Sequence, residues 1–368
     1  IISSRGRAGI IVPTGIATDA TTAPFFGDMV ESGSLVSLYD FENKEVIFPI
    51  HRSFKFCLLT MAGSEAATGA FDLAFFVHRI GDLHDDDRHF TLTPEEILLI
   101  NPNTKNCPIF RSKRDAEITK AVYRRVPVLV NEGKGEAGNP WGVSFKQGLF
   151  NMTSDSHLFR TRDEMEAAGF LLGGNQFVKG EEVWLPLYEG RMINHYDHRT
   201  ASVGVNPDNL YRSATTIQTN GSEHGDPTFC VLPRYWVSKK TFQESVRSQH
   251  PNSYFIGFKD VSSPTNERTF INAIIPFTPA GNKVPLLLTN CAKVTAIQFN
   301  SNLSSHIFDF TARQKMGGVS LNFYIVEQLP VLPPSAYTPT LTNFIAPRVI
   351  ELTYTAWDLE AFARDVLA

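Results

Sequence analysis

A change in the pattern of residue types at Pro127 constrains the fold of this chain more than any other feature of its sequence. Before Pro127, short β-rich runs alternate with one helical piece near Ala23 to Glu31. After Pro127, aromatic-rich runs are broken repeatedly by Gly, Pro and Asn, the residues that end strands and build turns. The sequence therefore predicts an α/β mixed fold, in which a mixed sheet is followed by an α+β region.

Continuous apolar runs predict strands in the first 80 residues. Ile10–Val12 and Phe54–Met61 have the composition of strands buried on both faces of a mixed sheet. The small and polar residues from Gly63 to Gly69 predict a hairpin loop, which joins Phe54–Met61 to a further strand at Ala70–His78.

Apolar periodicity and capping signals predict the helices. Ser112 with Asp115, and Thr161 with Glu164, have the spacing of a capping box. The predicted helical segments are Leu92–Ile100, Ser112–Val126, a short helix from Thr161, Lys239–Arg247, Asn266–Ile275, a pair within Val294–Lys315, and the amphipathic end Val349–Leu367.

Composition is that of an ordinary globular protein with a large core. The chain has 368 residues, of which 42% are apolar, a size that usually makes two or three domains. The four cysteines have no paired spacing, which argues against a zinc cluster or a disulfide framework. No run approaches the roughly twenty apolar residues of a membrane helix, and none resembles a signal peptide, so a cytoplasmic protein is expected.

Charge is segregated along the chain although the net charge is only −4. An acidic stretch precedes a basic predicted helix, and the helix could contact phosphates or be a solvated face of a linker. The acidic stretch comprises Asp82, Asp85, Asp86, Asp87, Glu95 and Glu96, and the basic residues are Arg111, Lys113, Arg114, Lys120, Arg124 and Arg125.

A second basic feature lies between residues 313 and 334. Arg313 and Lys315 stand where a helix is predicted to stop, and Gly317–Gly318 permit a tight reversal or a close approach of the backbone to a phosphate. An apolar, strand-like run closed by prolines follows. The alternative is a surface helix end with an ordinary glycine cap.

Several short motifs occur in an order that carries a resemblance. They are Gly9–Gly15, Leu35–Phe41, Val46–Pro49, Phe54–Thr60, Asn101–Thr104, Pro108–Asp115, Leu187–Ile193 with Asp197–Arg199, Pro233–Trp236, Asn266–Thr269 and Arg313–Pro334. In this order they resemble the C-terminal half of fused DNA adenine-N6 methyltransferases of type IIG restriction-modification systems and BREX-type phage defence. The first four look like the late strands of the methyltransferase domain of that family.

The resemblance implies four regions and a function in DNA recognition. Residues 1–80 would be the closing strands of a Rossmann-like methyltransferase sheet, 81–130 a helical connector, 131–335 a target-recognition domain and 336–368 a helical tail. No internal repeat is evident, which favours a single recognition domain. The implied partners are double-stranded DNA, an upstream methyltransferase half of the same polypeptide and other proteins of a defence system, with no membrane.

Two motifs of the family are missing. There is no Gly-rich loop to hold S-adenosylmethionine and no Asn-Pro-Pro-aromatic tetrapeptide to grip the adenine; Gly138-Asn-Pro-Trp141 has one proline and lies downstream of the strands it should precede. We therefore expect a fragment that recognises DNA, binds no cofactor itself and cannot methylate unaided, while the whole enzyme would use S-adenosylmethionine.

The candidate site residues follow from the resemblance and from side-chain chemistry. By motif, Phe48 matches the aromatic that contacts the flipped adenine; the alternative is a buried strand phenylalanine. Forked or amide donors read base edges, and cations contact phosphates. The predicted DNA contacts are Arg111, Lys113, Arg114, Arg191, His195, His198, Arg199, Arg234, Tyr235, Trp236, Arg313 and Lys315. Glu189 and Asp197 are expected to orient neighbouring arginines.

Two rival functions remain open. Asp115 followed by an apolar run ending in Glu132-Gly-Lys134 imitates a Mg²⁺-dependent nuclease. The 28 phenylalanines would also suit a protein-binding β domain with exposed aromatics. His195 and His198 stand at i and i+3, but no third ligand is marked, so no metal is expected.

Overall fold

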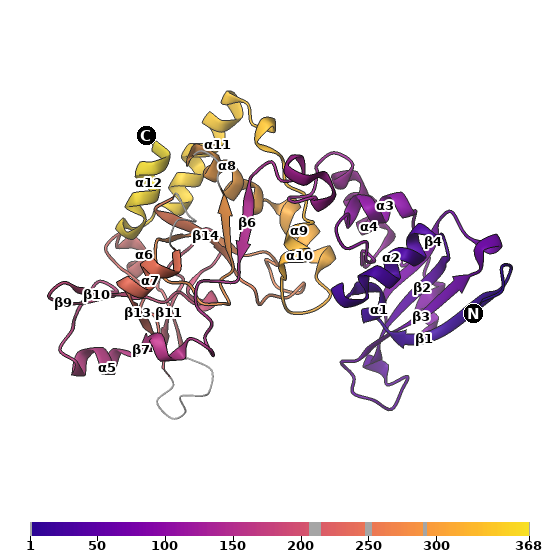
Figure 1. Cartoon of the computed structure of the whole chain (residues 1–368), viewed down its shortest axis with the longest axis horizontal. Coiled ribbons are helices and arrows are strands. Elements are labelled where there is room, and N and C mark those ends of the chain that lie inside the picture. The colour runs from indigo at the N-terminus through magenta and orange to yellow at the C-terminus, as the bar shows by residue number, and fades with distance from the viewer. Residues whose placement is uncertain (1, 206–214, 247–251, 290–292, 368) are drawn as a thin grey trace. The chain divides into compact units, whose positions relative to one another are not determined.

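The computed structural model describes residues 2–205, 215–246, 252–289 and 293–367 (Figure 1). The chain forms two compact units. Unit 1 contains residues 1–139, 310–318 and 322–332, and unit 2 contains residues 140–309, 319–321 and 333–368. Both helices and several sheets are present, so the predicted α/β mixed class is confirmed.

Unit 1 is built on a five-stranded mixed sheet with the order β1-β3-β2-β4-β5. Its strands are β1 (Arg7–Pro13), β2 (Leu35–Glu42), β3 (Lys55–Ala62), β4 (Phe71–Val77) and β5 (Phe90–Leu92). β1 and β2 both pair antiparallel with β3, and β4 pairs parallel with β2. Three strands, β1, β2 and β4, therefore point the same way and end at one edge of the sheet.

Short helices and 3₁₀ turns accompany this sheet. Those of unit 1 are α1 (Gly15–Thr18), α2 (Ala23–Glu31), α3 (Pro94–Ile100), α4 (Lys113–Tyr123) and α10 (Phe323–Val326), with 3₁₀ turns at Ala20–Thr22, Asn43–Glu45, Ser64–Ala66, Ile80–His84 and Glu132–Gly138. Buried side chains of the sheet and of α2, α3 and α4, among them Phe26, Leu38, Phe71 and Ile97, form one core.

The described residues of unit 2 form three sheets. A five-stranded antiparallel sheet has the order β7-β13-β10-β9-β8, a pair is formed by β11 and β12, and a four-stranded sheet has the order β15-β14-β16-β6. The strands are β6 (Val143–Lys146), β7 (Phe159–Arg160), β8 (Leu171–Gly173), β9 (Gln176–Lys179), β10 (Glu182–Pro186), β11 (Ala201–Gly204), β12 (Thr215–Gln218), β13 (Trp236–Ser238), β14 (Tyr254–Phe258), β15 (Asn272–Pro276) and β16 (Leu286–Thr289).

The helices of unit 2 are distributed along its sequence. They are α5 (Arg162–Ala167), α6 (Gly221–Gly225), α7 (Lys239–Val246), α8 (Lys293–Leu303), α11 (Pro339–Thr353) and α12 (Glu360–Leu367), with 3₁₀ turns at Ser156–Leu158, Gly190–Met192, Pro334–Ala336 and Trp357–Leu359. The division between the units falls within α9 (His306–Lys315).

Local helix signals in the sequence are confirmed. The helix predicted near Ala23 to Glu31 is α2, and the pair predicted within Val294–Lys315 is α8 with α9. Ser112 Oγ accepts the backbone N–H of Asp115 at the start of α4, at 3.1 Å. Thr161 and Glu164 form the expected reciprocal box at the start of α5. Capping depends on neighbouring residues alone, which is why the sequence reveals it.

Strand partners were predicted less well. The loop Gly63–Gly69 does not close a hairpin, because β2 lies between β3 and β4 in the sheet. Ile10–Val12 belongs to β1, an edge strand rather than one buried on both faces, and the side chains of Ile10 and Ile11 are 39% and 58% exposed. An apolar run shows that a strand forms, but its place in the sheet depends on distant residues.

Three segments have a different conformation from the one predicted. Asn266–Ile275, predicted as a helix, leads into strand β15, because residues 269–275 are buried without the solvent-facing side of an amphipathic helix. Val46–Pro49 is a bend instead of a strand, and Val46 has a left-handed backbone with φ of 54°. The run after Gly318 contains the helix α10 in place of a strand.

No helix among the described residues is both long enough and apolar enough to cross a bilayer.

Candidate nucleic-acid interface

The loop of residues 43–54, here called the Phe48 loop, joins β2 to β3 and is organised by one buried asparagine. Asn43 Nδ2 donates to the carbonyls of Phe48 and Ile50 at 3.0 and 3.1 Å, and its Oδ1 accepts the N–H of Phe48 at 3.0 Å. The Phe48 ring is half-buried and meets the edge of Phe56 at a centroid distance of 4.9 Å. Phe48 is therefore held in place with part of its ring open to solvent.

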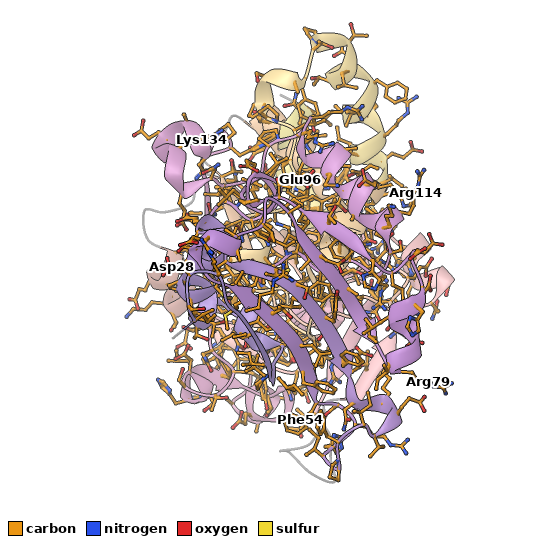
Figure 2. The ribbon with its side chains drawn as sticks, turned by 90° about the vertical axis from the view of Figure 1, so that its right-hand side faces the viewer. Asp28, Phe54, Arg79, Glu96, Arg114 and Lys134 are labelled. Carbon is orange, nitrogen blue, oxygen red and sulfur yellow. The ribbon has the colours of Figure 1, made fainter. Side chains whose placement is uncertain are left out.

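The rest of the Phe48 loop exposes apolar side chains. They are Val46 (43% exposed), Ile47 (38%), Ile50 (49%) and Phe54 (58%). Figure 2 shows Phe54 at one end of the sheet of unit 1. Pro13 pairs with Phe56, and Glu42 with Lys55, so the loop lies at the edge where β1 and β2 end. In open α/β sheets this carboxyl edge is where ligands bind.

A buried carboxylate forms hydrogen bonds that link the strands near this edge. Asp40 is 1% exposed, accepts the hydroxyl proton of Thr14 at 2.5 Å, and accepts the N–H of Phe76 at 3.2 Å. Burial raises the pKa of Asp40. Phe76 has φ of 58°, a strained value for a phenylalanine, and local strain of this kind gathers at functional sites.

Two cationic side chains lie over the ring of Phe76. The guanidinium of Arg111 lies 4.1 Å from its centroid, and the ammonium of Lys55 lies 5.0 Å from it. Arg111 is exposed and Phe76 is half-buried, so the edge combines a flat ring with positive charge. Neither Phe76 nor Asp40 was predicted from the sequence, because a positive φ within a strand and the burial of a carboxylate have no local signature.

Some basic side chains of helix α4 are exposed, and others form ion pairs. Lys113 and Arg114 are exposed at its start, and Figure 2 shows Arg114. Lys120 and Arg124, further along, are paired with Glu96, at 3.5 and 2.8 Å. The exposed cations of this region without an ion pair among the described residues are Lys113 and Arg114 in the first turn, Arg111 before it and Arg125 after the helix end.

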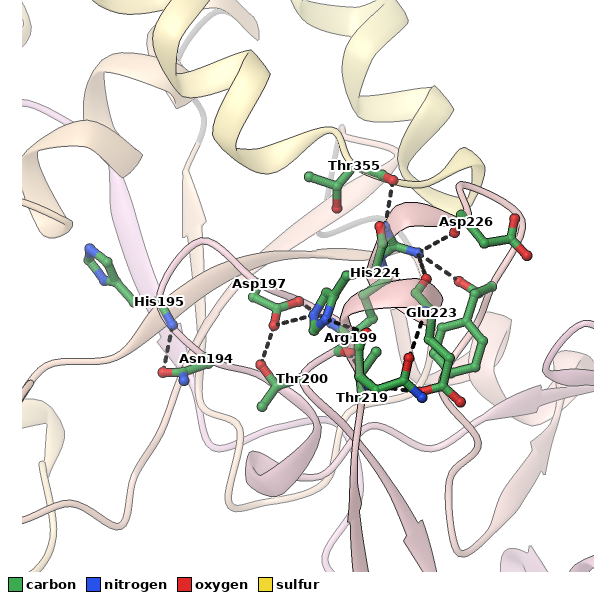
Figure 3. Close-up of polar contacts among 12 residues, drawn as sticks. Asn194, His195, Asp197, Arg199, Thr200, Thr219, Glu223, His224, Asp226 and Thr355 are labelled. Atoms are coloured by element: carbon green, nitrogen blue, oxygen red, sulfur yellow. Dashed lines mark hydrogen bonds and ion pairs between the residues drawn. The ribbon is translucent and has the colours of Figure 1, made fainter.

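In unit 2, the guanidinium of Arg199 is buried and bonds to several backbone carbonyls (Figure 3). It was predicted to be an exposed donor to DNA. Its side chain is fully buried, with Nη1 and Nη2 donating to the carbonyls of Glu223, His224, Asp226, Phe229 and Thr355 at 2.7 to 3.4 Å. His198 is also fully buried, and its Nε2 lies 2.8 Å from Asp358 Oδ1. Neither side chain reaches solvent to touch a base edge.

Asp197 and Glu189 are both hydrogen-bonded to arginines. Asp197 accepts the backbone N–H of Arg199 at 2.9 Å, whereas Glu189 holds the guanidinium of Arg234 through two contacts of 3.1 and 3.0 Å. The guanidinium of Arg234 also lies 4.8 Å from the ring of Tyr235. Arg234 and Tyr235 are half-buried, and this ion pair fixes their position.

The remaining predicted contacts differ in exposure. Trp236 is buried and donates its indole N–H to the carbonyl of Asn175 at 2.8 Å, while Arg191 is exposed. Arg313 is half-buried in α9. Lys315 donates to the carbonyls of Ile100 and Gln328 and to Asn101 Oδ1, at 2.6, 2.5 and 2.7 Å, which uses all three of its N–H groups.

His195 is half-buried, and its imidazole is kept neutral. Burial and, after it, the charge of Arg268 together lower the pKa of His195 to about 4, against the opposing effect of Asp309. The ring lies edge-on to Tyr196 at 4.7 Å.

We expect the stability of unit 2 to fall as pH falls from about 6.5 towards 4. Over this range the unfolded chain binds a proton at His195 that the folded chain does not, so acid favours unfolding. Solvent around the half-buried ring reduces the effect to about 1 kcal/mol. Urea unfolding at pH 7 and pH 5 should show a smaller acid shift for His195→Gln than for the parent chain. The exposed His157→Gln serves as control, and equal shifts in all three proteins would contradict the prediction.

The residues of the nuclease alternative do not form a metal site. Asp115 is engaged at the start of α4, where Ser112 Oγ donates to its carboxylate at 3.0 Å. Glu132 and Lys134 belong to an exposed 3₁₀ turn. In the described part of the chain, no three His, Cys, Asp or Glu side chains gather closely enough to hold a metal ion.

Comparison with known proteins gives matches among solved structures only. No protein-family model matches the chain, and no curated protein matches it. The chain is similar to the type IIG restriction endonuclease BpuSI, with a TM-score of 0.36 and 11% identity over 95% of this chain and 42% of that one. It is also similar to the type IIL restriction-modification enzyme MmeI, solved in complex with DNA, with a TM-score of 0.40 and 10% identity over 99% of this chain and 47% of that one. The chain thus spans less than half the length of either protein.

Proposed function

We propose that this chain is the sequence-specific DNA-recognition part of a DNA adenine-N6 methyltransferase of a restriction-modification or phage-defence system. The observation that carries the proposal is the Phe48 loop at the carboxyl edge of the mixed sheet. There Asn43 fixes a half-exposed phenylalanine at the position that the resemblance assigns to target-base contact.

The chemistry of this edge suits an extruded base. Turning a base out of a duplex costs a few kcal/mol, part of which is recovered when the base stacks on a flat apolar surface. Phe48 offers such a surface, and Phe76 lies at the same edge beneath Arg111 and Lys55. The exposed Lys113 and Arg114 are available to nearby phosphates.

The catalytic step would belong to an upstream half of the polypeptide. The described loops at the carboxyl edge contain neither a Gly-rich turn nor an Asn-Pro-Pro-aromatic motif, so this chain does not fit S-adenosylmethionine by itself. The edge strand β1 exposes Ile10 and Ile11. An exposed apolar edge strand favours aggregation unless another strand or segment covers it. Upstream methyltransferase strands would cover this edge and bring the cofactor.

The first test is salt-titrated binding to a pool of random-sequence duplexes, followed by sequencing of the retained fraction. We expect one short asymmetric site containing adenine to be enriched, with affinity falling steeply as salt rises because phosphate contacts release counterions. Absence of binding at low salt, both alone and with the upstream half attached, would refute the proposal.

Phe48→Ala tests the target-base contact on the selected site. The parent chain should bind more tightly when the partner of the target adenine is removed, because extrusion then costs less. Phe48→Ala should lose roughly tenfold in affinity for that duplex, the effect of about 1 to 2 kcal/mol of lost stacking. Phe25→Ala, at an exposed phenylalanine on α2, is the matched control. Equal affinities of the two variants would show that Phe48 does not contact the target base.

A second candidate function is docking to another protein of a defence complex. Helix α11 exposes Leu341, Phe344 and Leu352 on one side, and Trp357 beyond its end is 58% exposed. An apolar interface is much less sensitive to salt than phosphate contact. Binding that persists unchanged at high salt and that Phe344→Ala weakens would favour this function over DNA recognition.

A further inference from the structure

Arg268 is a half-buried cation without a counter-ion among the described residues. It lies between β14 and β15, its Nη1 atom is buried, and that atom has no hydrogen-bond partner. No ion pair of Arg268 occurs elsewhere in the described chain either. Guanidinium groups that lose water are normally paired, because an unpaired buried charge is costly.

His195 provides a second unpartnered nitrogen nearby. The turn that holds it lies against the segment of Arg268, because Tyr196 donates its N–H to the carbonyl of Asn272, four residues after Arg268, at 3.3 Å. Its Nδ1 is buried and has no partner within the described residues, while a backbone group of Ser304 bonds the ring. The charges of Arg268 and His306 lower the pKa of this ring, and the charge of Asp309 raises it. Figure 3 shows the ring of His195 turned away from the network around Arg199.

A tight turn holds His195 in this orientation. Asn194 and Asp197 exchange backbone hydrogen bonds of 2.6 and 2.9 Å, and Asn194 Oδ1 accepts the N–H of His195 at 2.8 Å. Tyr196, within the turn, has φ of 61°, a strained value for a tyrosine. The turn therefore fixes the imidazole beside an arginine that lacks a partner.

The acidic group that raises the pKa of His195, Asp309, is already engaged. Asp309 Oδ1 accepts the N–H groups of Thr269 and Phe270, at 2.7 and 2.8 Å, immediately after Arg268 in sequence. The carboxylate thus anchors the backbone on which Arg268 stands, and the guanidinium keeps donors available.

We propose that Arg268 and His195 form an oxyanion-binding pair that takes one phosphate group of a nucleic-acid backbone. The guanidinium supplies planar N–H donors, and the imidazole adds a donor at Nδ1 when it takes up a proton. The choice of a backbone phosphate over free phosphate rests on the DNA-recognition function proposed above, whereas the oxyanion chemistry does not.

The test compares Arg268→Gln with Arg364→Gln, an exposed arginine of α12 that is paired with Glu360. Arg268→Gln should leave the thermal midpoint unchanged, because the side chain donates no hydrogen bond to the described residues. It should weaken duplex binding about tenfold and reduce the slope of log affinity against log salt by about one, the effect of losing one phosphate contact. Arg364→Gln should behave like the parent chain. An unchanged slope in Arg268→Gln would overturn the proposal.

Inorganic sulfate and phosphate separate this proposal from the function on which it rests. We expect either anion to shift the NMR signals of the His195 ring and to raise the pKa of His195, and both effects should vanish in Arg268→Gln. If the parent chain binds no DNA but shows these shifts, the DNA function fails and the oxyanion pair stands with a free anion as its ligand. If the shifts are absent, or equal in Arg268→Gln, the pair is refuted whether or not DNA binds.

Discussion

Replacing Arg199 with leucine should lower the free energy of unfolding of unit 2 by about 3 to 5 kcal/mol, a large part of the stability of a typical domain. The guanidinium is the common partner of five backbone carbonyls from α6, from the segment after it and from Thr355 before the last helix. Leucine fills much of the space but leaves these buried acceptors without donors, and each unsatisfied group carries a desolvation penalty.

Tryptophan fluorescence measures this effect selectively. All four tryptophans, at 141, 184, 236 and 357, belong to unit 2. We expect the urea midpoint reported by fluorescence to fall sharply in Arg199→Leu, or the folded signal to be lost. Arg191→Leu, at an exposed arginine of the same region, should change the free energy by less than about 1 kcal/mol. Similar midpoints for the two variants would show that the hydrogen bonds of the Arg199 guanidinium contribute little to the free energy of unfolding.

Lys315→Met should destabilise unit 1 by about 3 kcal/mol. Burial disfavours the ammonium and lowers the pKa of Lys315, but three acceptors hold its protons and the ring of Tyr123 lies 5.0 Å away. Through these contacts the end of α9 is tied to the end of α3 and to Gln328. Methionine retains the chain length but leaves the carbonyl of Ile100 and the amide oxygen of Asn101 without this donor.

Hydrogen exchange of the β2 and β3 amides reports this loss, since unit 1 contains no tryptophan. Protection of these central strands should fall in Lys315→Met and stay unchanged in Lys113→Met, whose lysine is exposed at the start of α4. Equal protection in both variants would mean that the ammonium contributes no net stability.

Local features were the part of the fold that the sequence predicted. The cap at Ser112, the box at Thr161 and the helix Ala23–Glu31 depend on neighbours in the chain, and all three are confirmed. Strand partners depend on residues far away, which is why the hairpin predicted at Gly63–Gly69 was wrong. The same limit applies to the site: the motif at Phe48 was visible, whereas Phe76 reaches the same edge only because β4 pairs with β2.

Sequence alone determined where the cations are and which segments can cap a helix or form a strand. Tertiary structure decided which cations face inward, and it separated Arg199 and Lys315, enclosed by acceptors, from Lys113 and Arg114, which face solvent. It also left Arg268, which lies within the motif Asn266–Thr269 but was not among the predicted contacts, without a partner among the described residues. The physical reason is that a charge gains or loses its partners only when distant backbone carbonyls are brought around it, and a linear sequence does not show that event.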